Sequence, residues 1–150
     1  MEQAHVYTVY ERIAQHFSET RYSQWNSVKQ FLDSLPTHSV VLDAGCGNGK
    51  NMLHRPHLHF LGADITNQLL EQSISKNPQT CLIRASLSRL PFRDNSVDAV
   101  ICIAVIHHLS SEQLRKQCME EISRVLIPGG KALVTVWMED QPKKSKWIQL

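Results

Sequence analysis

The sequence lacks a long apolar stretch, a strong charge excess and a secretory signal. Its longest uninterrupted apolar run covers residues 99–106, whereas crossing a bilayer requires about 18–20 residues, so we expect no membrane association. The N-terminus has no basic segment followed by an apolar core. Lys and Arg number 16 against 14 Asp and Glu, and the net charge of +2 neither requires nor excludes nucleic acid. We expect an intracellular protein, in the cytoplasm and also in the nucleus.

Cysteine is scarce as well, with four residues in the chain. Cys46, Cys81, Cys102 and Cys118 form no Cys-x-x-Cys pair and have no ligand-like spacing to histidine. Free cysteines in apolar surroundings behave as small hydrophobic residues. We therefore expect no structural zinc site and no other metal in this chain.

The composition is that of a globular chain, 42% hydrophobic and 20% charged, and 150 residues predict a single domain over 1–150. Apolar spacing predicts helices over 6–17, 25–35 and 67–75, and a fourth between a capping box at 110–113 and Pro128-Gly129-Gly130. Short β-branched runs predict strands over 39–43, 59–64, 80–84, 97–103 and 132–137. This alternation predicts an α/β fold with a mostly parallel sheet and helices on both faces.

A glycine-rich turn, DAGCGNG over 43–49, follows the first predicted strand and opens the next helix. Glycines allow a tight turn and let the backbone approach a ligand closely. Asp64 follows Asp43 by 21 residues and ends the second predicted strand, where a carboxylate can accept hydrogen bonds from a ribose. Together these features predict a nucleoside-cofactor site. The alternative is an ordinary loop, with Asp64 as a helix cap.

The charge beside the turn indicates which nucleoside it binds. The glycine spacing differs from a P-loop, which excludes ATP hydrolysis, and from the G-x-G-x-x-G of nicotinamide enzymes, which makes an oxidoreductase the least favoured alternative. Asp43 would repel a pyrophosphate but attract a cation. S-adenosyl-L-methionine carries an ammonium and a sulfonium group, so we expect it to be the cofactor.

These residues resemble a known family. The turn is similar to the first motif of class I S-adenosylmethionine-dependent methyltransferases. Further strings resemble the eukaryotic tRNA methyltransferases that esterify 5-carboxymethyluridine at wobble position 34, a group that includes the methyltransferase domain of the AlkB-homologue wobble enzyme. The strings are HFSETRYSQW (16–25), LPFRD (90–94), IAVIHHLS (103–110), RVLIPGG (124–130) and VW (136–137). The resemblance implies a Rossmann-like class I fold, from which this short chain would lack the C-terminal strands.

By this resemblance, the cofactor-binding residues surround three parts of S-adenosylmethionine. The glycine turn would hold the amino-acid end, Asp64 the ribose, and Ser86-Leu87 would lie beside the adenine. Ser86 stands where the family usually has aspartate, so we expect cofactor binding to be weaker by about 1 kcal/mol. Asn26 stands where the family usually has proline. The full predicted set is Asp43, Gly45, Gly47, Asn48, Gly49, Asp64, Ile65, Ser86, Leu87 and Ile103.

The implied reaction needs orientation rather than a general base. A carboxylic acid with a pKa of about 4 is already ionised at neutral pH, so the protein must place one oxygen against the methyl group. Arg21 would hold the carboxylate, with the alternative of a surface ion pair; His107 or His108 would supply a second donor, with the alternative of a helix cap. Trp25 is expected in the core rather than as a base-stacking platform, and the lysines at 143–146 in solvent rather than on phosphates.

The sequence thus predicts an S-adenosylmethionine-dependent tRNA methyltransferase that esterifies the carboxymethyl group of the wobble uridine. The resemblance implies two partners, the tRNA anticodon and a small zinc-binding activator subunit that shields exposed sheet surface. Two alternatives stay open. One is a small-molecule methyltransferase on the same scaffold, and the other is a folded remnant that no longer transfers methyl groups.

Overall fold

The computed structural model describes residues 24–53 and 55–136. Three sequence predictions concern residues outside this part of the chain: the helix over 6–17, Arg21 as a carboxylate ligand, and the solvated lysines at 143–146. None of the helices in the described ranges is long and apolar enough to cross a membrane.

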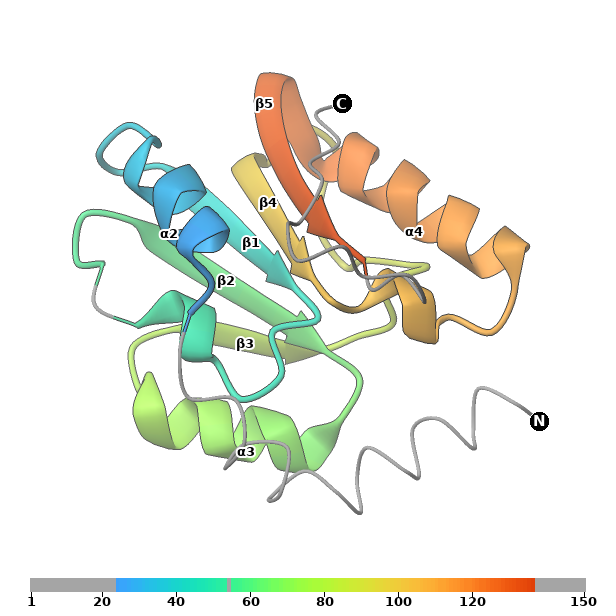
Figure 1. Cartoon of the computed structure of the whole chain (residues 1–150), viewed down its shortest axis with the longest axis horizontal. Coiled ribbons are helices and arrows are strands. Elements are labelled where there is room, and N and C mark those ends of the chain that lie inside the picture. The colour runs from blue at the N-terminus through green and yellow to red at the C-terminus, as the bar shows by residue number, and fades with distance from the viewer. Residues whose placement is uncertain (1–23, 54, 137–150) are drawn as a thin grey trace.

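Five parallel strands form one sheet in the order β3-β2-β1-β4-β5 (Figure 1). They are β1 Val40–Ala44, β2 His59–Asp64, β3 Cys81–Arg84, β4 Val97–Ile103 and β5 Leu126–Thr135. The predicted parallel sheet is confirmed, and the bounds of β2 and β4 coincide with the predicted ones. Because the strand order reverses between β1 and β4, the connections that follow these two strands lead to opposite sides and leave a crevice at their carboxyl ends.

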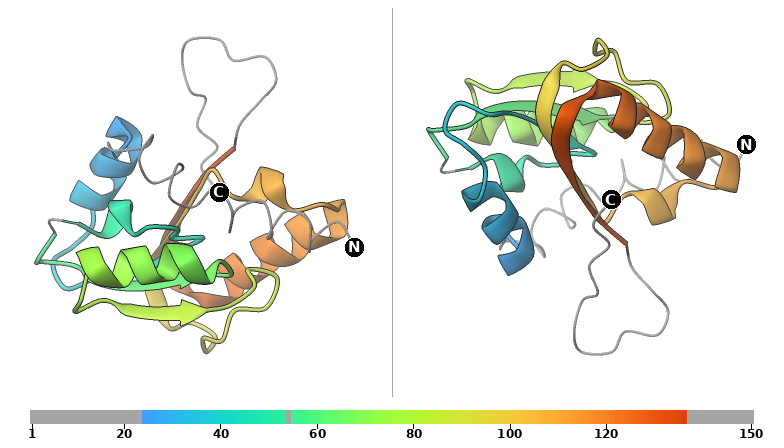
Figure 2. Two further views of the ribbon diagram at one scale, coloured as in Figure 1. Left: turned by 90° about the horizontal axis from the view of Figure 1, so that it is seen from below. Right: turned by 90° about the horizontal axis from the view of Figure 1, so that it is seen from above.

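Helices cover both faces of the sheet, as predicted. Alternate residues of β1 point to opposite faces, so Val41 packs in the cluster of α2 (Asn26–Asp33) and Leu42 in the cluster of α4 (Glu112–Val125). The α3 helix (Asn67–Lys76) packs over β2 and β3. It lies on the α2 side, since Phe60 of β2 packs both in the α2 cluster and in the cluster that includes Leu70 of α3. Figure 2 shows α2 and α4 on opposite sides of the sheet.

The glycine turn leads into a short 3-10 helix rather than into the expected α-helix. The segment η1 covers Lys50–Met52, and the chain then runs on to β2. Nine residues separate Gly49 from His59, and Pro56 is among them, which leaves too little chain for several helical turns and a connection.

Both ends of α4 differ slightly from the prediction. Ser111, rather than Ser110, is the N-cap, and its hydroxyl accepts a hydrogen bond from the Leu114 amide at 3.2 Å. The helix ends at Val125, before the proline and glycines, and Leu126 already pairs with Val97 of β4. The register then shifts before Ala99 pairs with Lys131, so Pro128-Gly129-Gly130 form an irregularity in β5 rather than the stop of the helix.

Candidate active site

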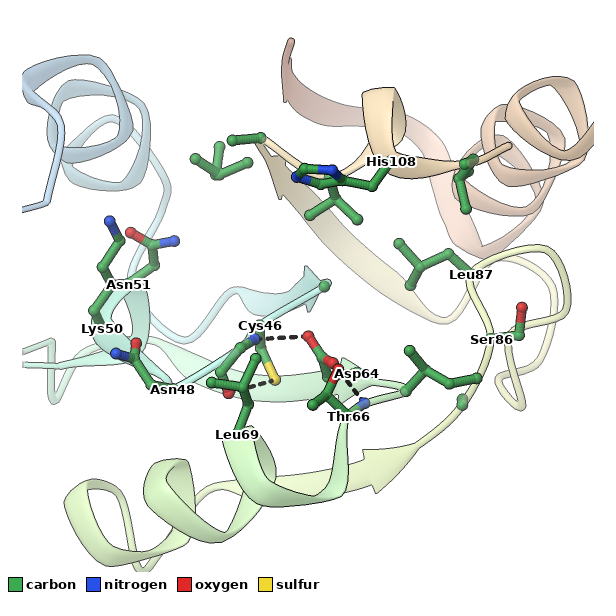
Figure 3. A pocket seen from close by; sticks show the side chains of 18 of the residues that line it. Cys46, Asn48, Lys50, Asn51, Asp64, Thr66, Leu69, Ser86, Leu87 and His108 are labelled. Carbon is green, nitrogen blue, oxygen red and sulfur yellow. Dashed lines mark hydrogen bonds between the residues drawn. The ribbon is translucent and has the colours of Figure 1, made fainter. Parts of the chain in front are cut away.

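A pocket lies at the carboxyl ends of β1 to β4, at the point where the strand order reverses (Figure 3). Each strand is followed by a segment that lines the pocket, as expected for ligand sites of open α/β sheets. These segments include Gly45–Asn48 at the end of β1, Asp64–Thr66 at the end of β2, Ala85–Leu87 at the end of β3 and Ile103–Val105 at the end of β4. The predicted residues Gly45, Gly47, Asn48, Asp64, Ile65, Ser86, Leu87 and Ile103 therefore lie around one cavity.

The glycine turn has no room for side chains at its two ends. Gly45 and Gly49 have φ angles of +84° and +78°, which L-residues rarely adopt. A Cβ atom at Gly45 would overlap the side chain of Val105, and one at Gly49 would overlap that of Ser73. The turn is thus held tightly against the end of β4 on one side and against α3 on the other. Gly49 itself is not among the residues that line the pocket.

Asp64 is fixed by backbone amides of the turn and of its own loop. Its Oδ2 accepts a hydrogen bond from the Gly47 amide at 2.8 Å, and its Oδ1 accepts one from the Thr66 amide at 2.8 Å. Burial raises the pKa of this carboxyl group, and these hydrogen bonds oppose the rise. Each oxygen of a carboxylate has two lone pairs, so Asp64 can still accept hydrogen bonds from a ligand in the pocket.

Asp43, in β1 two residues before Gly45, is a contrasting carboxylate. It is fully buried, and neither oxygen has a hydrogen-bond partner among the described residues. Burial raises its pKa to about 7; the charge of Asp64 adds to the rise, and the charge of Lys50 and the nearby Asn51 side chain oppose it. A buried carboxyl group without a partner is costly, and a cation bound nearby would offset this cost. Asp43 does not itself line the pocket.

Asn51 is a pocket residue that the sequence prediction missed. It is 5% exposed and lines the cavity, and its Oδ1 has no hydrogen-bond partner among the described residues. Its backbone carbonyl accepts a hydrogen bond from Gln24 Nε2 at 3.2 Å, which links the start of α2 to η1. The orphaned oxygen is therefore a second acceptor at the β1 side of the pocket. The position of Asn51, two residues after the glycine turn, is the sequence feature that could have identified it.

The wall after β3 is made of Ser86 and Leu87, but the serine hydroxyl already has a partner. Ser86 Oγ lies 2.9 Å from Ser88 Oγ within the same loop. In Figure 3, Ser86 lies at the margin of the pocket, beyond Leu87. Ser86 therefore lines the pocket, as the resemblance implies, with its hydroxyl already engaged within its own loop.

The segment after β4 contains strained backbone. Ala104 has a φ angle of +57°, and its amide donates to both the carbonyl and the hydroxyl of Thr135, at 3.1 and 3.0 Å. The following 3-10 helix η2 (Ile106–His108) carries the two predicted histidines. His108 lines the pocket, whereas His107 is not among the lining residues; their ring centroids are 4.1 Å apart.

Trp25 corrects one prediction. It was expected in the core, but it is 38% exposed and lines the pocket. Trp25 is the N-cap residue of α2, and the Lys50 ammonium lies 6.0 Å from the centroid of its ring. At the start of the helix the chain has not yet entered the stripe that Val28 and Leu32 bury, which explains the exposure. Within the described ranges, no group of three or more His, Cys, Asp or Glu could hold a metal ion.

Comparisons with known proteins agree on one class. A family model described as a methyltransferase domain matches residues 42–134. The chain is 45% identical to a tRNA (carboxymethyluridine(34)-5-O)-methyltransferase of Arabidopsis thaliana, covering 100% of this chain and 37% of that protein. It is 43% identical to the enzyme of that name from Schizosaccharomyces pombe, covering 93% and 60%. The mouse enzyme ALKBH8 is 40% identical, covering 99% and 23%. The chain thus spans less than two thirds of these relatives.

Solved structures show the same fold. One is a complex between the Haloferax volcanii Trm112 methyltransferase activator and a methyltransferase, with a TM-score of 0.70, 22% identity, and coverage of 85% of this chain and 59% of that one. Another is a SAM-dependent methyltransferase from Thermotoga maritima, with a TM-score of 0.69, 17% identity, and coverage of 85% and 60%.

Proposed function

Since the chain belongs to the methyltransferase domain family, we propose that it is an S-adenosyl-L-methionine-dependent methyltransferase that esterifies the 5-carboxymethyl group of the tRNA wobble uridine. The names of relatives with 40–45% identity support this substrate. The observation in the structure that supports the cofactor is the buried Asp43, which has no hydrogen-bond partner in the described part of the chain and lies in β1, two residues before Gly45.

The residues around the pocket fit S-adenosylmethionine. The cofactor is a cation, and it supplies a methyl group on a sulfonium that a nucleophilic oxygen can accept. Asp43 and the Asn51 oxygen would favour its positive charge from the β1 side. Asp64 would accept hydrogen bonds from the ribose, and Leu87 and Ile103 would form apolar walls for the base.

The protein's task toward the substrate is to orient an oxygen that is already ionised. His108, on the β4 side, would donate a hydrogen bond to the carboxylate without removing a proton from it. His107, the preceding residue, would support His108 through the ring contact. Arg21 would be the second cation at this carboxylate. It lies outside the described residues, so its role rests on the sequence.

The part of the pocket wall formed by Trp25 and Lys50 suits a planar, anionic substrate. Trp25 offers an exposed aromatic ring, and the Lys50 ammonium lies near that ring. Bases stack on aromatic side chains, and phosphates attract lysine. This pair would therefore contact the nucleotides next to the wobble base.

A small zinc-binding activator subunit is the proposed protein partner. Within the described residues, β3 and β5 each pair with a single strand, so both have an open edge that a partner could cover. The fold neighbour from Haloferax volcanii is a methyltransferase in complex with an activator, which supports this class of partner.

The test is transfer of labelled methyl from S-adenosylmethionine to tRNA that carries 5-carboxymethyluridine, with the activator co-expressed. Base-labile label that is lost in Asp64→Ala would support the proposal. Label on small carboxylic acids but not on tRNA would favour the small-molecule alternative. Binding of S-adenosylmethionine without transfer, while a full-length relative works in parallel, would favour a non-catalytic remnant.

A further inference from the structure

We propose that Arg124 and Glu121 of α4 form a clamp that positions the Ser86-Leu87 wall of the pocket and thereby sets the affinity for the nucleoside half of the cofactor. This inference rests on the proposed function. Neither residue lines the pocket, so both act as positioning residues rather than catalytic ones.

Arg124 uses its whole guanidinium group on one loop and its acidic partners. Its Nη1 donates to the Phe92 carbonyl at 2.8 Å and to Asp94 Oδ1 at 2.8 Å. Its Nη2 donates to the Leu90 carbonyl at 3.0 Å and to Glu121 Oε2 at 2.8 Å, and Nε donates to Glu121 Oε1 at 2.7 Å. A planar fork with fixed donors holds its partners in one geometry, which a lysine cannot reproduce.

Glu121 completes the clamp from the same helix. Its Oε2 accepts a hydrogen bond from the Leu90 amide at 2.6 Å, so both backbone groups of Leu90 are bound by α4 side chains. The end of the helix adds two more contacts, because the Asn95 and Ser96 amides donate to the carbonyls of Arg124 and Val125 at 2.9 and 2.8 Å.

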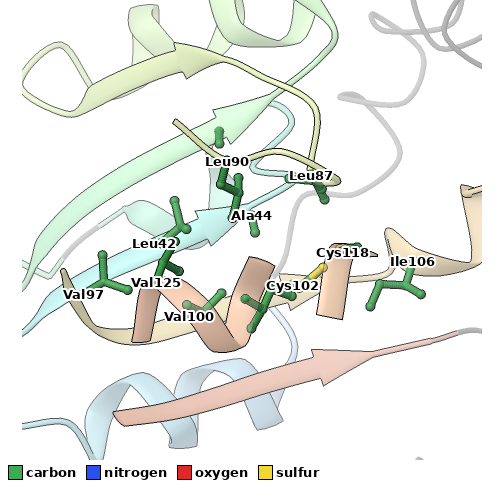
Figure 4. Packing of buried hydrophobic residues seen from close by; sticks show 12 residues of the cluster. Leu42, Ala44, Leu87, Leu90, Val97, Val100, Cys102, Ile106, Cys118 and Val125 are labelled. Atoms are coloured by element: carbon green, nitrogen blue, oxygen red, sulfur yellow. The ribbon is translucent and has the colours of Figure 1, made fainter. Parts of the chain in front are cut away.

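The clamped loop needs this support, because residues 85–96 between β3 and β4 form no helix or strand. Such a loop cannot pair its backbone groups in a regular ladder. Leu87 and Leu90 are buried at 7% and 3% exposure and pack in the α4 cluster with Val125 (Figure 4). The loop is therefore pressed onto α4 by apolar contacts and oriented there by the clamp.

The pocket wall lies between two fixed points. At one end, the Ala85 amide donates to the Asp64 carbonyl at 3.0 Å. At the other end, Leu90 is held by the clamp, and the Arg89 amide donates to the Ser86 carbonyl at 3.1 Å. Ser86 and Leu87 are the pocket-lining residues between these points, so loss of the clamp frees one end of the wall only.

The experiment compares Arg124→Gln and Arg124→Lys with Lys116→Gln. Lys116 lies on the same helix, and its exposed ion pair with Glu120 at 3.9 Å stays within that helix, which makes it a matched control. Amide hydrogen exchange without ligand is measured for residues 86–92. We expect at least tenfold faster exchange there in Arg124→Gln, no change in β1 or β4, and wild-type exchange in Lys116→Gln. Unchanged exchange over 86–92 would overturn the clamp, whether or not the protein is a methyltransferase.

The functional arm measures the Kd for S-adenosylhomocysteine and the KM and kcat for methyl transfer. We expect a tenfold or larger rise in Kd and KM for Arg124→Gln, a smaller rise for Arg124→Lys, and kcat within twofold of wild type. Faster exchange with unchanged Kd and KM would overturn the link to the cofactor. A loss of kcat as large as the rise in KM would overturn it too. Failure of the wild-type chain to bind S-adenosylhomocysteine would overturn the proposed function itself, and with it the cofactor part of this inference.

Discussion

Polar groups on the two sides of the pocket are paired to opposite extents. On the β1 side, both oxygens of Asp43 and the Oδ1 of Asn51 are buried without a hydrogen-bond partner in the described residues. On the β3–β4 side, Glu121 and Arg124 satisfy each other and the backbone of the loop. Since native proteins rarely leave such groups unpaired, the first side is arranged for a ligand and the second for rigidity.

This difference predicts opposite effects of removing a carboxylate from each side. Removing an unpaired buried charge relieves a cost in the folded protein, whereas removing a paired one creates a cost. The expected changes below run from the largest to the smallest.

Asp43→Asn should stabilise the free protein at alkaline pH. The pKa of Asp43 is raised to about 7 in the folded state, so folding favours its protonated form. Its contribution to stability is fully present below the unfolded pKa and is lost as pH rises through the folded pKa. The contribution of Asp43 to the free energy of unfolding should therefore fall by up to roughly 4 kcal/mol between pH 4 and pH 7, and Asp43→Asn should remove this contribution. Urea titrations at several pH values measure it, and an unchanged slope in the variant would contradict the assignment.

Gly45→Ala should destabilise the protein by about 3 kcal/mol, since it combines an unfavourable φ angle with overlap of the Val105 side chain. Gly47→Ala is the matched control. Its φ angle is also positive, but only a Leu69 side-chain atom lies within 4 Å, at 3.9 Å, so about 1 kcal/mol is expected. Thermal melting of the two variants provides the measurement. Equal losses of stability in the two variants would show that the close contact between Gly45 and Val105 adds nothing to the cost of the substitution.

Glu121→Ala should destabilise the protein by about 2 kcal/mol, because it leaves the Leu90 amide and the Nε of Arg124 without their acceptors. The hydrogen bond and charge of Arg124 lower the pKa of Glu121, so this contribution is present above the unfolded pKa and is lost as pH falls through the folded one. Stability curves at pH 3 and pH 7 should therefore show a smaller gap between variant and wild type at the lower pH. A gain in stability at pH 7 would remove the contrast with Asp43.

Ala104→Gly should have the smallest effect, a stabilisation of about 0.5 kcal/mol. Glycine relieves the left-handed φ angle, and its greater freedom in the unfolded chain offsets much of that gain. Thr135→Val removes one of the two acceptors of the Ala104 amide and should destabilise instead. Chemical unfolding measures the change in the free energy of unfolding for each variant. A change of the same sign in both variants would contradict the backbone strain at Ala104.

The sheet could be predicted from the sequence because each strand is a distinct apolar run. Both β2 and β4 match their predicted bounds. The short η1 could not be predicted from its motif, because the length of the connection, rather than the glycines, decides whether a helix forms there.

The pocket-lining positions could be predicted where backbone position alone decides, as at Gly45, Gly47 and Asp64. The site could not be predicted where side-chain orientation decides. The exposure of Trp25 depends on where α2 begins, and the hydrogen bonding of the Ser86 hydroxyl depends on Ser88, two residues away. The clamp joins residues about 30 positions apart, and such pairings follow from the packing of α4 on the loop rather than from a motif.

The most direct test of the central claim is the proton balance of S-adenosylmethionine binding near pH 7, measured by calorimetry in buffers of different ionisation enthalpy. A cation bound beside Asp43 lowers the pKa of that carboxyl group, so the wild-type chain should release protons beyond those released by Asp43→Asn. Wild type should also bind more tightly. Equal proton release and equal affinity in the two proteins, or no binding by the folded wild-type chain, would contradict the claim that the unpaired carboxylate marks the cofactor site.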